Sequence, residues 1–126
     1  MHLRVIHWNI RVNCDIKKVI GFLFQNITER CLVNLQEVSE TSFGELSQTL
    51  KEQSIFSLHF RPPGCFEGRN RRMGVATLVF GGSVERASLL ERSVFPERTL
   101  ITEISMDGHP VKNFTFHSLT GVDYKK

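Results

Sequence analysis

The chain has 126 residues, of which 40% are hydrophobic and 23% are charged. These shares are those of ordinary globular domains, and they exclude a disordered, fibrous or collagen-like chain. Sixteen Lys and Arg against 13 Asp and Glu give a net charge of +3, which mildly favours a polyanionic partner. We therefore expect a single domain over residues 1–126 with one hydrophobic core.

The cysteine pattern and the N-terminal sequence bear on the cellular compartment. Three cysteines without a CxxC pair predict neither a disulfide framework nor a cysteine zinc site. The N-terminus lacks a basic segment followed by an apolar one, and no apolar run approaches the ~20 residues of a membrane span. We expect a cytoplasmic protein with no export or membrane-anchoring signal.

The first part of the chain predicts two strands joined by a helix. Residues 3–9 (LRVIHWN) are rich in β-branched and apolar side chains, which is typical of a buried strand. Apolar residues then recur at three- and four-residue steps, which predicts a helix from an N-cap at Asp15 to about Thr28. Residues 31–36 (CLVNLQ) predict a second strand that reaches Glu37. Because one helix separates the two strands, we expect them to be parallel.

A second helix, a strand and a loop are predicted next. Residues 41–52 carry apolar side chains on one face, which predicts a helix with its N-cap at Thr41 or Ser42. Residues 55–60 (IFSLHF) predict a strand. Residues 61–73 contain prolines, glycines and four arginines without an apolar period, which predicts an exposed loop.

The rest of the chain predicts antiparallel hairpins. Apolar, β-rich segments are separated by the glycine turns Gly81-Gly82 and Asp107-Gly108. The predicted strands cover residues 74–80, 84–90, 99–105 and 111–119. The whole chain is therefore expected to be an α+β fold, with a mixed β-sheet and two helices on one face of it.

Two polar side chains end the predicted parallel strands. Asn9 and Glu37 lie at the carboxyl ends of these strands, where ligands collect in parallel sheets. A carboxylate and an amide carbonyl are hard oxygen donors suited to Mg²⁺. Their position also fits, and by itself favours, a solvent-facing acid at Glu37 and an Asx turn at Asn9. Position alone therefore leaves both the metal site and the plain loop open.

Four segments, IHWNI, NLQEV, GRNRRMGVATLVF and FHS, occur in an order that resembles the endonuclease/exonuclease/phosphatase family. The resemblance implies half of a four-layer α/β/β/α sandwich and a divalent-metal-dependent phosphoester hydrolase that uses Mg²⁺ or Mn²⁺. Its substrate is expected to be a nucleic acid or another phosphodiester. The resemblance also implies that Asn9 and Glu37 help bind the metal and that His117 contacts the scissile phosphate. Histidine suits this role because its pKa lies near neutral pH.

The resemblance implies further phosphate contacts in and near the arginine-rich loop. Asn70 in GRN and Arg98 in PERT are similar to family positions that approach the phosphate backbone. Arg69, Arg71 and Arg72 add positive charge beside them and are expected to bind nucleic acid. A solvated charged loop explains the three arginines equally well.

The resemblance also implies segments that residues 1–126 do not contain. Gly74 stands where the deoxyribonuclease branch carries a carboxylate, so the proton-transfer role of that carboxylate is not carried over. The Asp-x-Asn and Asp-His segments of the family are missing too, and we expect a truncated domain with little or no activity alone. A missing C-terminal half or a second copy is expected to cover the inner face of the first sheet. The alternative function is a non-catalytic remnant that binds nucleic acid or a protein partner through the arginine-rich loop.

Overall fold

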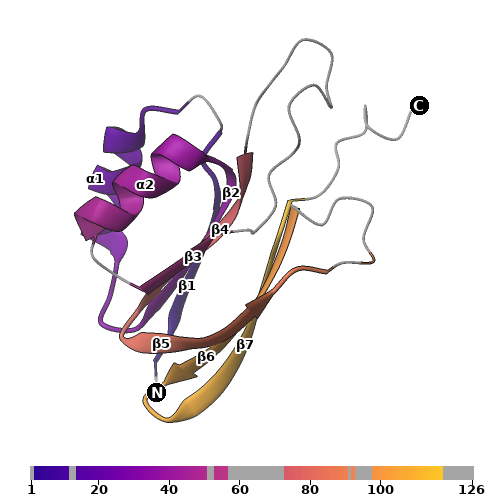
Figure 1. Cartoon of the computed structure of the whole chain (residues 1–126). Coiled ribbons are helices and arrows are strands. Elements are labelled where there is room, and N and C mark those ends of the chain that lie inside the picture. Colours follow the sequence, from indigo (N-terminus) through magenta and orange to yellow (C-terminus); the bar gives the residue numbers. More distant parts are fainter. Residues whose placement is uncertain are drawn as a thin grey trace.

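The described part of the chain forms three stacked layers, one of helices and two of β-sheet (Figure 1). The computed structural model describes residues 2–11, 14–50, 53–56, 73–90, 92 and 98–117, with the backbone alone given at 53–56 and 73. The helices cover one face of a four-stranded sheet, and a three-stranded sheet lies against its other face (Figure 1). The predicted α+β fold with both helices on one face of a mixed sheet is confirmed.

The four-stranded sheet has the order β1-β2-β4-β3. Its strands are β1 (Arg4–Asn9), β2 (Cys31–Ser39), β3 (Gln53–Phe56) and β4 (Met73–Phe80). β1 and β2 are parallel, as predicted, whereas β4 runs antiparallel to both β2 and β3. β3 begins two residues earlier than the predicted strand over residues 55–60. Residues 57–60 of that prediction lie outside the described residues.

The two helices are α1 (Ile16–Asn26) and α2 (Glu40–Leu50). The side chain of Asp15 accepts a hydrogen bond from the Lys17 N–H, so the predicted cap of α1 is confirmed. The predicted start of α2 was wrong. Its first turn is capped by Ser39, whose hydroxyl accepts the Ser42 N–H, so the helix begins directly after β2. Eleven residues are too few for either of these helices to cross a membrane.

The three-stranded sheet has the order β5-β6-β7 and is antiparallel throughout. Its strands are β5 (Gly82–Ser88), β6 (Thr99–Met106) and β7 (His109–Phe116). The predicted hairpin through Gly81-Gly82 was wrong, because β4 and β5 lie in different sheets. The chain passes from one to the other at Gly81 alone, which has a φ of 77°, and β5 begins two residues earlier than predicted. Asp107 and Gly108 form the predicted turn between β6 and β7.

The buried side chains form two separate apolar groups. The larger group lies between the helices and the four-stranded sheet, and the smaller one lies between the two sheets. Strand alternation divides β2 between them, because Val33 and Leu35 belong to the first group and Leu32 to the second. The members of the smaller group that are almost fully buried are Leu32, Val79, Ile104 and Met106.

The inner face of the four-stranded sheet is largely covered by this chain's own second sheet. β7 packs on β2 and β4, β6 packs on β4, and β5 packs on β3. The predicted pairing of two copies through this face therefore gains no support from the described residues. At the edge of the sheet, Val5 on β1 stays 44% exposed.

Cys31 at the start of β2 carries a thiol that should resist ionisation. It is fully buried, and this burial raises the pKa of the Cys31 thiol above its ordinary value of 9.0. Iodoacetamide at pH 8 should therefore leave Cys31 unmodified in the folded protein and alkylate it in 8 M urea, as peptide mass spectrometry would measure.

The same pKa shift gives a pH dependence of stability. As the pH rises above 9.0, the unfolded thiol ionises first while the folded thiol stays protonated, so the folded state binds more protons and stability falls. Urea unfolding at pH 8 and pH 10 should show this loss. The loss should be smaller in Cys31→Ala, and an equal loss in that variant would contradict the assignment.

Candidate functional site

Asn9 and Glu37 come together because β1 and β2 are parallel neighbours. Asn9 is the last residue of β1 and lies opposite Gln36 in the register. The Ile10 N–H donates to the Gln36 carbonyl oxygen at 3.2 Å, which continues the ladder one step beyond the strand end. The two side chains therefore leave neighbouring strands at the same edge of the sheet.

Glu37 lies within a β-bulge, although the sequence predicted it at the end of a strand. Leu35 pairs with Ala76 and Val38 pairs with Gly74, so β2 holds one more residue than β4 between these pairs. Glu37 has a φ of 56° and Arg11, across the strand ends, has a φ of 70°. Both are left-handed conformations that cost a non-glycine residue about 1–2 kcal/mol. Such strain is concentrated at functional sites.

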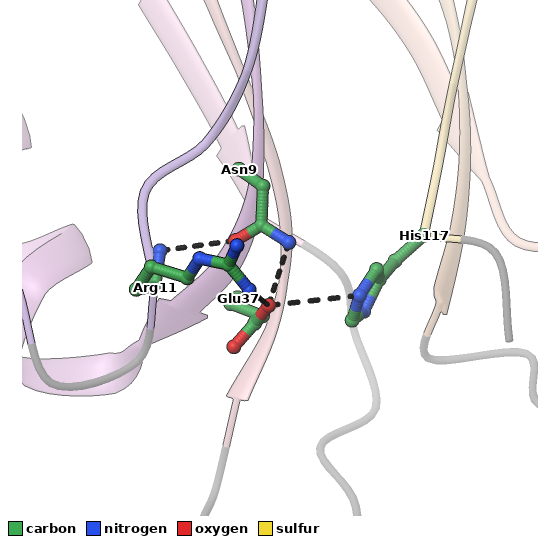
Figure 2. A network of polar contacts seen from close by, with 4 residues as sticks. All are labelled: Asn9, Arg11, Glu37 and His117. Atoms are coloured by element: carbon green, nitrogen blue, oxygen red, sulfur yellow. Dashed lines mark hydrogen bonds and ion pairs between the residues drawn. The ribbon is translucent and has the colours of Figure 1, made fainter. Parts of the chain in front are cut away.

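The bulge directs the Glu37 carboxylate toward three other polar side chains, those of Asn9, Arg11 and His117 (Figure 2). The Asn9 side-chain amide donates to Glu37 Oε2 at 2.6 Å. Arg11 Nη1 and His117 Nε2 each lie 3.7 Å from the same oxygen. The Asn9 amide oxygen accepts the Arg11 N–H at 3.0 Å, so Asn9 also forms the Asx turn that its position suggested.

His117 reaches this group from the other sheet. It follows the last residue of β7, and its N–H donates to the Arg98 carbonyl oxygen at 2.8 Å, just before β6 begins. The side chains of His117 and Glu37 are only 17% and 16% exposed, whereas that of Arg11 is 79% exposed. The contact between His117 and Glu37 therefore bridges the two sheets and is partly shielded from solvent. The exposed Arg11 side chain lies beside it.

The donor set at Glu37 fits a hard divalent cation. Among the described residues, no hydrogen bond or ion pair reaches Glu37 Oε1, while Oε2 takes all three polar contacts. Within the described part of the chain, Oε1 is therefore left for a ligand. Mg²⁺ commonly takes one or two protein carboxylates and completes its shell with water and phosphate oxygens. The described residues contain no cluster of three or more His, Cys, Asp or Glu that could hold a metal ion.

The structure brings three of the predicted site residues together and leaves others outside its description. Asn9, Glu37 and His117 meet, and Arg98 is buried and tied to His117 through its backbone. The predicted phosphate-contacting loop residues lie outside the described residues; they are Asn70, Arg69, Arg71 and Arg72. Sequence reasoning assigned no role to Arg11, and its place two residues after Asn9 is the signal that could have indicated one.

Two solved structures share this arrangement of strands and helices. TDP2 from Caenorhabditis elegans superposes with a TM-score of 0.69 at 19% identity, over 97% of this chain and 37% of that chain. An AP endonuclease from Archaeoglobus fulgidus superposes with a TM-score of 0.57 at 18% identity, over 91% of this chain and 41% of that chain. The chain has an endonuclease/exonuclease/phosphatase-like fold. Neither a protein-family model nor a curated protein sequence matches it.

The chain spans about two fifths of the length of the two solved structures it matches. At this level of sequence identity, the likeness establishes the fold and not the activity. The chemistry of the site must therefore be argued from its own side chains.

Proposed function

We propose that this chain carries the metal-binding and phosphate-contacting part of a Mg²⁺-dependent phosphoester hydrolase that acts on nucleic acid. The observation that carries the proposal is the meeting of Asn9, Glu37 and His117, on two different sheets, around a carboxylate with one available oxygen. The likeness in fold to an AP endonuclease supports a nucleic acid as the substrate class. Free thiols at Cys14 and Cys31 support a reducing cytoplasm as the compartment.

Each side chain has a distinct task in this proposal. Glu37 supplies a hard oxygen to the ion, and Asn9 holds the other carboxylate oxygen in place while its own amide oxygen keeps a lone pair for the ion. His117 contacts the scissile phosphate, with Arg11 and Arg98 adding positive charge near it. When bound, Mg²⁺ or Mn²⁺ acts as a Lewis acid that stabilises negative charge developing on the phosphate oxygens.

The second candidate function is nucleic-acid or protein binding without catalysis. It rests on Arg69, Arg71 and Arg72, together with Asn70, in one short segment of the sequence. Binding of this kind requires no metal, and its affinity for DNA falls steeply as salt rises. Dependence on a divalent cation therefore separates the two functions.

The test uses Mn²⁺ as a paramagnetic probe of the Mg²⁺ site. Addition of Mn²⁺ to the isotope-labelled protein should broaden the NMR signals of Asn9, Glu37, Val38 and the His117 ring first, and excess Mg²⁺ should reverse this broadening. Any hydrolysis of bis(4-nitrophenyl) phosphate, which is expected to be weak for this chain alone, should require Mg²⁺ or Mn²⁺ and stop in EDTA. Gly108, in the turn at the opposite end of β6 and β7 from His117, provides a reference signal that should stay sharp.

The opposite outcome favours the binding function. It consists of uniform or absent broadening with Mn²⁺ and a salt-dependent affinity for DNA that falls when Arg69, Arg71 and Arg72 are replaced by glutamine. The logarithm of the DNA affinity falls linearly with the logarithm of the salt concentration. If this slope becomes shallower by about one unit for each arginine neutralised, those arginines contact phosphates directly.

A further inference from the structure

A buried cluster of amides and hydroxyls lies between the two sheets, next to the small apolar group. Its members are Asn34 on β2, Thr77 on β4, and Asn113 and Thr115 on β7, and none of them is more than 7% exposed. Asn34 and Asn113 form a reciprocal pair, in which each amide donates to the oxygen of the other, at 2.9 and 2.8 Å. The Thr77 and Thr115 hydroxyls lie 2.9 Å apart and both donate to Asn34.

This cluster makes one alignment of the two sheets far more favourable than others. A buried amide that loses its partner costs about 1–3 kcal/mol, whereas apolar side chains tolerate sliding with smaller losses. The reciprocal pair joins residues that are 79 positions apart in the sequence, and it forms only when β2 and β7 cross at one register. Buried polar networks of this kind specify packing more than they add stability.

The same two strands carry the two sides of the candidate site. Asn34 precedes Glu37 by three residues on β2. Asn113 lies on β7 and precedes His117, which directly follows that strand, by four residues. The 3.7 Å contact between Glu37 and His117 bridges the sheets. A slip of one residue moves a strand by about 3.3 Å, which is enough to break that contact.

We propose that Asn34 and Asn113 are positioning residues, which align the two sheets so that Glu37 and His117 face one another. The importance of this alignment for catalysis rests on the proposed function. The alignment of the two sheets itself can be measured without a metal. Neither asparagine contacts the candidate site directly in any described hydrogen bond; each acts through the strand that carries it.

The test replaces both amides by side chains of similar shape, in the variant Asn34→Leu/Asn113→Leu. Thr77 and Thr115 can then bond to one another, with one hydroxyl as donor and the other as acceptor, so only one O–H group loses its acceptor. The urea midpoint should therefore fall only modestly. Cross-relaxation between the His117 ring and the Glu37 side-chain protons should disappear. Broadening of the His117 ring signals by Mn²⁺ should fall at least about fivefold. This broadening varies with the inverse sixth power of the distance between the ion and the ring, and a slip of one residue lengthens that distance by about 3.3 Å. Broadening at Val38 should stay.

Two matched controls distinguish alignment from a general loss of buried polar groups. Thr77→Val/Thr115→Val removes two hydroxyls from the same cluster and leaves the amide pair intact. Thr102→Val on β6 removes a fully buried hydroxyl that has no hydrogen-bond partner among the described residues. Both should retain the contact between His117 and Glu37.

The outcomes separate this inference from the proposed function. A folded Leu pair with cross-relaxation between His117 and Glu37 intact overturns the positioning role. If Mn²⁺ broadens nothing in the unaltered protein, the proposed metal site fails, and the cross-relaxation measurement still decides the positioning role. If the Leu pair does not fold, Asn34→Ser, which can keep a hydroxyl beside Thr77 but cannot form the reciprocal pair, should show the same loss of contact.

Discussion

Replacing Glu37 with glutamine should weaken Mn²⁺ binding by at least about 100-fold, because ligand carboxylates are worth more than the outer-shell partners whose loss costs about 10–100-fold. Glutamine has the same shape and can still accept the Asn9 amide hydrogen at the position of Oε2, so the fold should persist. Isothermal titration with Mn²⁺ would measure the affinity, and any hydrolysis of bis(4-nitrophenyl) phosphate should fall in parallel.

Glu103 on β6 offers the matched control for this charge change. Its side chain is 46% exposed and pairs with Arg86 at 3.9 Å, on the three-stranded sheet and apart from the four polar side chains at Glu37. Glu103→Gln makes the same change in net charge and should leave Mn²⁺ affinity within about twofold of the unaltered protein, since exposed charges are largely screened. Equal weakening in both variants would mean that Mn²⁺ responds to overall charge and not to a site.

Replacing Gly81 with alanine should destabilise the protein by about 2–5 kcal/mol, the sum of left-handed backbone strain and overpacking. Gly81 has a φ of +77°, and a Cβ atom there would meet the carbonyl oxygen of Glu29 closer than real Cβ atoms approach. The loss is a large share of the roughly 5–15 kcal/mol that keeps a domain folded. Urea unfolding monitored by the fluorescence of Trp8 would measure it.

Other glycines separate the two causes. Gly108 has a φ of +75° and nothing within 4 Å of an added Cβ, so Gly108→Ala should cost only the strain, about 1–2 kcal/mol. Gly44 lies within α2 and also has open space, so Gly44→Ala should stabilise the protein by about 0.5–1 kcal/mol. If Gly81→Ala costs no more than Gly108→Ala, the Glu29 carbonyl moves aside and close packing at this bend is not limiting.

The elements with strong local signals could be predicted from the sequence. α1 has a regular apolar period and an aspartate at its cap, and the parallel pairing of β1 and β2 follows from the single helix between them. That pairing was enough to predict that Asn9 and Glu37 meet. The start of α2 was missed because Ser39 acts both as the last residue of β2 and as a cap.

The features that depend on distant partners could not be predicted in this way. The bulge at Glu37 exists only because β4 offers one residue fewer than β2 between two paired positions. Asn34 is a polar residue within an apolar run, but its partner Asn113 lies on the other sheet, and no local pattern connects them. The approach of His117 to Glu37 likewise follows from the stacking of two sheets and not from any spacing along the chain.

The passage of the chain from one sheet to the other at Gly81 has a consequence for how the protein opens. β4 and β5 form a nearly continuous stretch from Met73 to Ser88, so the same segment supplies hydrogen-bonded partners to both layers. Neither layer can detach without disturbing the other, and the two should behave as one cooperative unit. Amide hydrogens in the centres of β4 and β6 should therefore exchange with deuterium through the same global opening, with matching free energies.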